Sequence, residues 1–207
     1  MARLIVREVN RRLPVKIQEQ AFVAGCMLAD YSLVTLKHQH LPCRSLEWVK
    51  ENISLLSAIE ADFDVFDDNY LVAYHLGTVV HYVCDFFCWA HSGETFGNTR
   101  EHLQYEDFLD NYRYSHAEEF SSREWLPDLV AMRSADEINE HLDHHVKAYR
   151  QGGQSVRRDL ELAISHSIRV LYSLAAIRLR QTEQAAALDA LEAERVRPVY
   201  ANQVTAD

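Results

Sequence analysis

The chain has 207 residues, 48% of them hydrophobic, and a formal net charge of −10. This length is enough for one domain with a substantial core, and 6 glycines with 4 prolines leave little material for many turns, which favours long helices. The charge argues against a broad nucleic-acid surface, because neutralisation of phosphates by basic side chains supplies most non-specific affinity for nucleic acids. A local metal site could still bind a phosphate.

We therefore expect one all-α domain over residues 1–195, followed by a frayed tail over residues 196–207. The N-terminal segment has no apolar run of signal-peptide length, so a cytoplasmic protein is expected. Apolar residues at helical spacing predict a short helix over residues 4–13 and another over residues 15–29. A loop with two histidines follows, and Ser45 is a candidate N-cap for the next helix.

An apolar run over residues 71–91 predicts a buried central helix, around which the other helices form a bundle. Its polar residues Thr78, His81 and Asp85 fall within a sector of about 60° on a helix that turns about 100° per residue. A buried ionised aspartate one turn from a histidine is unfavourable unless it is paired. The pair is either a satisfied hydrogen bond between helices or two ligands of a divalent metal. The run is about long enough for a transmembrane segment, but His75, His81 and Asp85 within it argue against one.

A second metal site is suggested by the residues that follow. On a continuing helix His91 would lie about 9 Å beyond Asp85 and about 120° round from it, so it should not bind the same ion. The acidic stretch at residues 61–69 lacks the pattern of a calcium loop and is expected to be a solvated linker. After a glycine-containing loop, His102 and Glu106 share one helix face at i,i+4 spacing, as a metal pair needs.

The rest of the sequence is typical of a helical framework. Helices are predicted up to about residue 120, over residues 134–149, and as one long helix over residues 155–194. The histidines at 141, 144 and 145 have no acidic partner motif, so we expect surface or interface residues rather than ligands. Cys84 and Cys88 are expected to be buried small hydrophobes rather than metal-binding thiolates.

The ligand spacing resembles that of the bacterial zinc-dependent phospholipase C family, which includes the N-terminal domain of alpha-toxins and is structurally related to fungal single-strand nucleases. The resemblance is carried by His81-x3-Asp85-x5-His91 and His102-x3-Glu106, with Leu76-Gly77 in register with a leucine-glycine of the family. It implies an all-α, phospholipase C/nuclease-like domain that holds zinc.

Carried over residue by residue, the resemblance implies two zinc sites. One would be held by Asp30, His38 or His40, His81 and Asp85, and the other by His91, His102 and Glu106. Asp30 would also accept the proton of the attacking water, and Tyr31 is a candidate substrate contact, with an ordinary packed tyrosine as the alternative. The family's third zinc uses a processed N-terminal tryptophan and an early histidine. This chain has no histidine before His38, so we expect that third site to be absent or rebuilt with carboxylates such as Glu8 or Glu19.

The implied function is a metal-dependent phosphodiester hydrolase, in which a metal-activated water attacks the phosphorus of a phosphodiester or phospholipid-like small substrate. Two alternatives stay open at this point. One is a nuclease-type phosphodiesterase, although such enzymes usually have Asp as the last ligand of the second site, where this chain has Glu106. The other is a non-catalytic, metal-stabilised helical protein. The sequence leaves the oligomeric state open, a homo-oligomer included.

Overall fold

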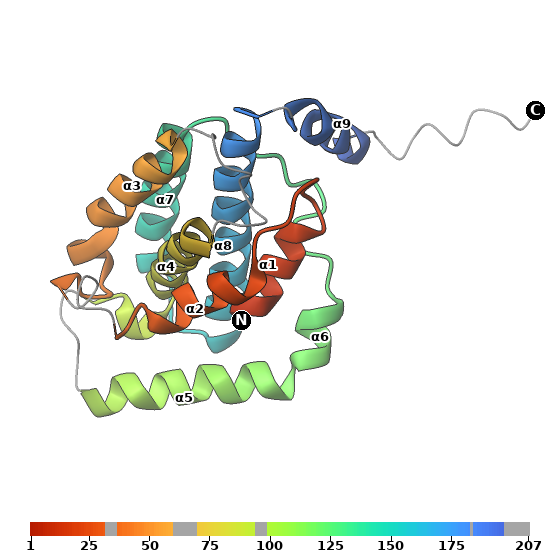
Figure 1. Ribbon diagram of the computed structural model, residues 1–207. Coiled ribbons are helices and arrows are strands. Elements are labelled where there is room, and N and C mark those ends of the chain that lie inside the picture. The colour runs from red at the N-terminus through yellow and green to blue at the C-terminus, as the bar shows by residue number, and fades with distance from the viewer. Residues whose placement is uncertain (32–36, 60–69, 94–98, 183, 197–207) are drawn as a thin grey trace, which may run out of the picture.

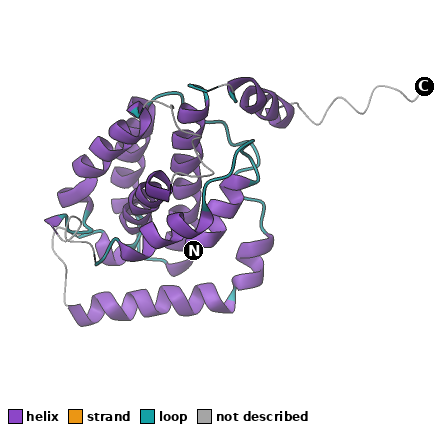
Figure 2. Ribbon diagram, viewed as in Figure 1, coloured by secondary structure: helices purple, strands orange, loops and turns teal. Residues whose placement is uncertain are grey.

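The computed structural model describes residues 1–31, 37–59, 70–93, 99–182 and 184–196. Within these ranges the chain forms nine α-helices, one short 3-10 helix and no strand (Figure 2), so the all-α expectation is confirmed. The helices are α1 (Ala2–Asn10), α2 (Glu19–Leu28), α3 (Pro42–Ala58), α4 (Tyr70–Phe86), η2 (Trp89–His91), α5 (Thr99–Ser115), α6 (Ala117–Ser122), α7 (Ala135–Arg150), α8 (Val156–Leu179) and α9 (Ala185–Val196). The expected acidic linker and the tail from residue 197 lie outside the described residues.

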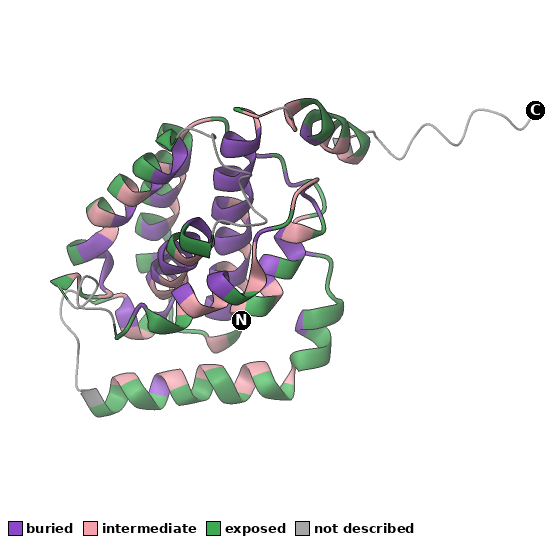
Figure 3. Ribbon diagram, in the orientation of Figure 1, coloured by how far each residue is buried: buried purple, intermediate pink, exposed green. Residues whose placement is uncertain are grey.

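The helices α4 and α8 form the centre of the bundle, and α1, α2, α3 and α7 pack around them (Figure 1). Both central helices are lined with buried apolar side chains, whereas α5 is largely exposed along one side of the molecule (Figure 3). Among the described residues only α8 has the length and hydropathy of a membrane-spanning helix, and 78% of its most apolar window is buried inside the bundle. These are also the properties of the core helix of a bundle.

The helices α2 and α4 approach each other closely at two glycines. Gly25 faces the backbone of Tyr74, and Gly77 faces the carbonyl of Phe22, so that a Cβ at either glycine would overlap the neighbouring backbone. The Cys26 thiol also donates to the Gly77 carbonyl at 3.2 Å. This contact brings the end of α2, and Asp30 just after it, beside the middle of α4.

The central helix is shorter than expected, because it ends at Phe86 and His91 lies in η2. The backbone N–H of Trp89 donates to the carboxylate of Asp159 at 2.9 Å instead of continuing the helical ladder. The expectation that apolar side chains are buried all round this helix was also wrong at its first turn, where Leu71 is 67% exposed.

Three other helix boundaries differ from the expectation for local reasons. α3 begins at Pro42, whose fixed φ suits the first helical position, so Ser45 lies inside the helix and its hydroxyl donates to the Leu41 carbonyl. The predicted helix over residues 155–194 is broken after Leu179, and the Thr182 hydroxyl accepts from the Gln184 N–H just before α9 starts. The helix predicted up to residue 120 is likewise interrupted between α5 and α6.

Candidate metal centre

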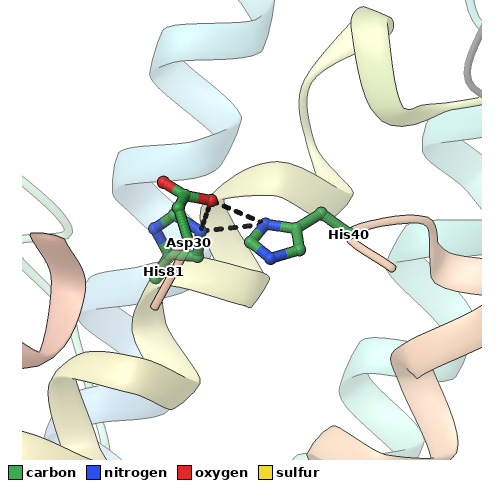
Figure 4. A group of neighbouring side chains, drawn as sticks. All are labelled: Asp30, His40 and His81. Atoms are coloured by element: carbon green, nitrogen blue, oxygen red, sulfur yellow. Dashed lines mark hydrogen bonds and ion pairs between the residues drawn. The ribbon is translucent and has the colours of Figure 1, made fainter. Parts of the chain in front are cut away.

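Three side chains from distant parts of the sequence meet beside α4 and form the first candidate group (Figure 4). Asp30 follows α2, His40 precedes α3, and His81 lies on α4. The Asp30 Oδ1 atom is 3.4 Å from His40 Nδ1 and 3.3 Å from His81 Nε2, and the two ring nitrogens are 3.0 Å apart. The potential ligand atoms of this group all lie within 4.8 Å of one another.

The loop before α3 brings His40, and not His38, to Asp30 and His81. The His38 ring instead stacks on Trp48, with ring centroids 4.5 Å apart and an interplanar angle of 17°. The His38 carbonyl accepts a hydrogen bond from the Tyr82 hydroxyl at 2.8 Å. His38 therefore anchors the loop that presents His40.

The second candidate group consists of His91, His102 and Glu106, whose potential ligand atoms also lie within 4.8 Å of one another. The Oε1 atom of Glu106 is 3.3 Å from His91 Nε2 and 3.2 Å from His102 Nε2. The Nδ1 atoms of the two histidines face backbone carbonyls, that of His40 at 2.9 Å and that of Ala90 at 3.3 Å. Donation from Nδ1 leaves Nε2 facing Glu106, where it donates to the carboxylate when protonated or, as a free lone pair, can bind a metal ion. The three side chains converge, as the ligands of one ion would have to.

Asp85 lies between the two groups. Its Oδ2 atom is 2.7 Å from His40 Nδ1 and 3.2 Å from His81 Nε2, while its Oδ1 atom is 4.0 Å from His91 Nε2. The carboxylate side chain is only 17% exposed. One aspartate can thus serve the first group with one oxygen and face the second group with the other.

The charges of the first group are strongly coupled. Burial alone would raise the pKa of Asp85, but His81 and His91 hold that pKa well below its usual range. Burial opposes protonation of His81, yet Asp85 and Asp30 outweigh it and raise the pKa of His81 to about 10. A hydrogen bond from His81 lowers the pKa of Asp30. The two carboxylates thus favour a positive charge at His81, as a metal ion bound among these ligands would also supply.

Both groups line a single pocket of about 360 Å³. A larger neighbouring cavity of about 730 Å³ shares His102 with it and is lined by the aromatic rings of Trp89, Tyr105 and Phe108. Tyr31 follows Asp30 directly and is 78% exposed, so the alternative of an ordinary packed tyrosine is wrong.

The carboxylates considered for a third site have other partners. Glu8 pairs with Arg11 and Arg12, and Glu19 pairs with Arg7 at 2.9 Å. The thiols beside the site are also poor ligands, because burial raises the pKa of Cys84 to about 12.

Asp159 is a supporting residue that the sequence did not reveal. Its carboxylate is buried, and Oδ2 accepts from the Trp89 N–H at 2.9 Å and from the Tyr105 hydroxyl at 2.7 Å. It thereby joins α8 to the segment that carries His91 and to the helix that carries His102. An aspartate in the first turn of a helix is common for electrostatic reasons alone, so its spacing gave no signal.

The donors present fit zinc, which binds imidazole nitrogens and carboxylate oxygens in sets of three or four. Residues 1–159 match the family model described as zinc dependent phospholipase C. Because the match covers more than half of the chain, the protein belongs to the zinc-dependent phospholipase C family, a class of metal-dependent phospholipid hydrolases. No curated protein and no solved structure matches the chain.

Proposed function

We propose that this chain hydrolyses a phosphodiester bond of a phospholipid-like substrate in the pocket that the two groups share. The observation that carries the proposal is the meeting of Asp30, His40 and His81 with the second group across Asp85. Asp30, His40, His81 and Asp85 would hold one zinc ion, and His91, His102 and Glu106 another. Bound zinc supplies Lewis acidity toward phosphate oxygens and makes water nucleophilic at neutral pH.

Asp30 is the residue best placed to take a proton from the attacking water. Its Oδ1 atom faces the two histidines, while 54% of the side chain remains exposed. The lowered pKa keeps this carboxylate ionised at neutral pH and able to accept a proton. As water adds to phosphorus, its proton passes to Asp30 and the bond from phosphorus to the alcohol oxygen breaks. Asp30 then gives this proton to the departing oxygen, so that the alcohol leaves neutral and the carboxylate is regenerated.

The cavity next to the metal pocket suggests where the alcohol part of the substrate lies. Trp89 and Phe108 line this cavity and are themselves 38% and 62% exposed. Aromatic rings beside the reacting centre offer an apolar surface to a lipid alcohol. Tyr31, exposed next to Asp30, is a second candidate substrate contact.

The test is hydrolysis of bis-p-nitrophenyl phosphate by the purified, metal-replete chain. We expect turnover that a chelator abolishes and that zinc restores. Asp30→Asn should lose about 10²–10⁴-fold in rate while remaining folded, because an amide keeps the volume but cannot accept the proton. Asp107→Asn, at an exposed position of α5, is the matched control and should retain the rate.

The opposite result would be equally clear. If metal-replete protein shows no turnover of phospholipid or of the generic diester, and Asp30→Asn changes only the melting temperature, the chain is a non-catalytic member of the family. The metal would then stabilise the fold and do no chemistry.

A further inference from the structure

A second polar cavity, of about 340 Å³, lies away from the metal pocket and shares no lining residue with it. Four arginines from separate parts of the chain line this cavity. Arg11 and Arg12 follow α1, Arg123 follows α6, and Arg195 lies in the last turn of α9. We refer to it as the arginine pocket.

Carboxylates are too few at the arginine pocket to neutralise these side chains. Only Glu8 and Glu124 belong to its lining, and Glu8 already pairs with both Arg11 and Arg12. Arg123 contacts Glu161 at 2.7 Å, but Arg157 contacts the same carboxylate oxygen at 3.2 Å. Guanidinium groups that lie close together repel one another, so this local excess of positive charge is unfavourable unless an anion joins them.

Arg195 gives an independent indication of a missing partner. Its Nη2 atom reaches the Arg11 carbonyl at 3.4 Å. Its Nη1 atom is buried and has no hydrogen-bond partner among the described residues. Glu192 and Glu8 lie near enough to favour the charge on Arg195. A charged donor without an acceptor is still disfavoured, and an anion in the pocket would offer acceptors to this guanidinium group.

We propose that the arginine pocket binds a phosphate group, as inorganic phosphate, a phosphomonoester or a lipid phosphate. Guanidinium groups match phosphate oxygens through paired N–H donors, and several of them around one small cavity suit a doubly charged anion. The side chains are held in place for this role, since Arg12 donates to the Trp125 carbonyl and Arg123 lies 4.6 Å above the Trp125 ring. The site does not depend on the chemistry proposed for the metal centre.

The proposal is tested by calorimetric titration of the metal-replete full chain with inorganic phosphate. Because zinc can also bind phosphate, the informative quantity is the part of the phosphate binding that is lost when the arginines are replaced. Arg195→Gln and Arg123→Gln should each weaken that component at least about tenfold, a change typical for loss of a charged hydrogen bond. Arg3→Gln, at an exposed position of α1, is the matched control and should leave the titration unchanged.

Hydrolysis of the generic diester separates this proposal from the proposed function. The arginine variants should keep the wild-type rate, because they lie outside the metal pocket. Equal phosphate affinity in wild type and in both variants, or no binding by wild type, would overturn the proposal. Since Arg195→Gln could loosen α9, its melting temperature is compared with that of Arg123→Gln, which changes a different segment.

Co-sedimentation with phosphatidylcholine vesicles that contain phosphatidic acid distinguishes the two sources of phosphate. Vesicle binding that is lost in Arg123→Gln assigns the pocket to a lipid headgroup. Phosphate binding without vesicle binding assigns it to a soluble phosphate or phosphomonoester.

Discussion

Asp85 differs from the other candidate ligands because its two oxygens face different groups. Asp85→Asn should therefore lower the zinc content of both sites, whereas His102→Ala should lower that of the second site alone. Loss of a ligand or of its hydrogen-bonded partner typically weakens metal affinity by about 10–100-fold. Elemental analysis after dialysis measures this, with Asp107→Asn as the control. Full zinc retention by Asp85→Asn would contradict the shared role.

His141 and His166 form a hydrogen-bonded pair away from the metal pocket. His141 Nε2 lies 2.9 Å from His166 Nδ1. Burial, with the charges of His145 and Arg169 nearby, lowers the pKa of His141 to about 4 and that of His166 to about 3. Both are therefore neutral in the folded state at pH 7. Below about pH 6.5 the unfolded chain binds more protons, so stability falls as the pH decreases.

We expect chelator-treated protein to lose at most about 1.4 kcal/mol of unfolding free energy per pH unit for each of these histidines between about pH 6.5 and 4. Urea unfolding at a series of pH values measures the slope. His166→Phe should flatten it, because the stacking on Phe87 is kept while the titrating group is removed. An unchanged slope in this variant would mean that other groups cause the loss of stability at low pH.

At the scale of elements, the α2–α4 contact is the one that positions Asp30 beside His81. Gly25→Ala and Gly77→Ala should each destabilise the protein by about 1–3 kcal/mol or more, because the added Cβ would meet backbone atoms that cannot rotate away. Thermal unfolding measures the loss. Gly153→Ala is the control, since nothing lies within 4 Å of its added Cβ, and it should leave the melting temperature unchanged.

At the scale of the whole molecule, two of the seven candidate ligands lie on a helix that buries little of its own surface. Tyr105 is the one buried side chain of α5 among those whose burial is described, yet the helix supplies His102 and Glu106. Zinc binding should therefore contribute directly to the docking of α5. Hydrogen exchange measured with and without chelator should show faster exchange in α5 and little change in α4. Equal protection in both states would mean that protein contacts alone hold α5.

Much of this architecture could be predicted from the sequence, because it follows from local spacing. The i,i+4 pairs of His81 with Asp85 and of His102 with Glu106 indicated the two groups, and apolar periodicity indicated most helices. Long-range contacts decided the rest. The choice between His38 and His40 depended on stacking with Trp48. The end of α4 depended on Asp159, which is 70 residues beyond Trp89 in the chain. The arginine pocket gave no sequence signal, because its members are scattered from Arg11 to Arg195.

The place of Asp159 in the chain has a consequence for biosynthesis. Every candidate ligand, from Asp30 to Glu106, leaves the ribosome before Asp159 does, yet this carboxylate fixes the segments that carry His91 and His102. A nascent chain that ends before α8 would hold all the donors without the carboxylate that positions two of them. The order of synthesis thus delays a well-defined centre until α8 has docked.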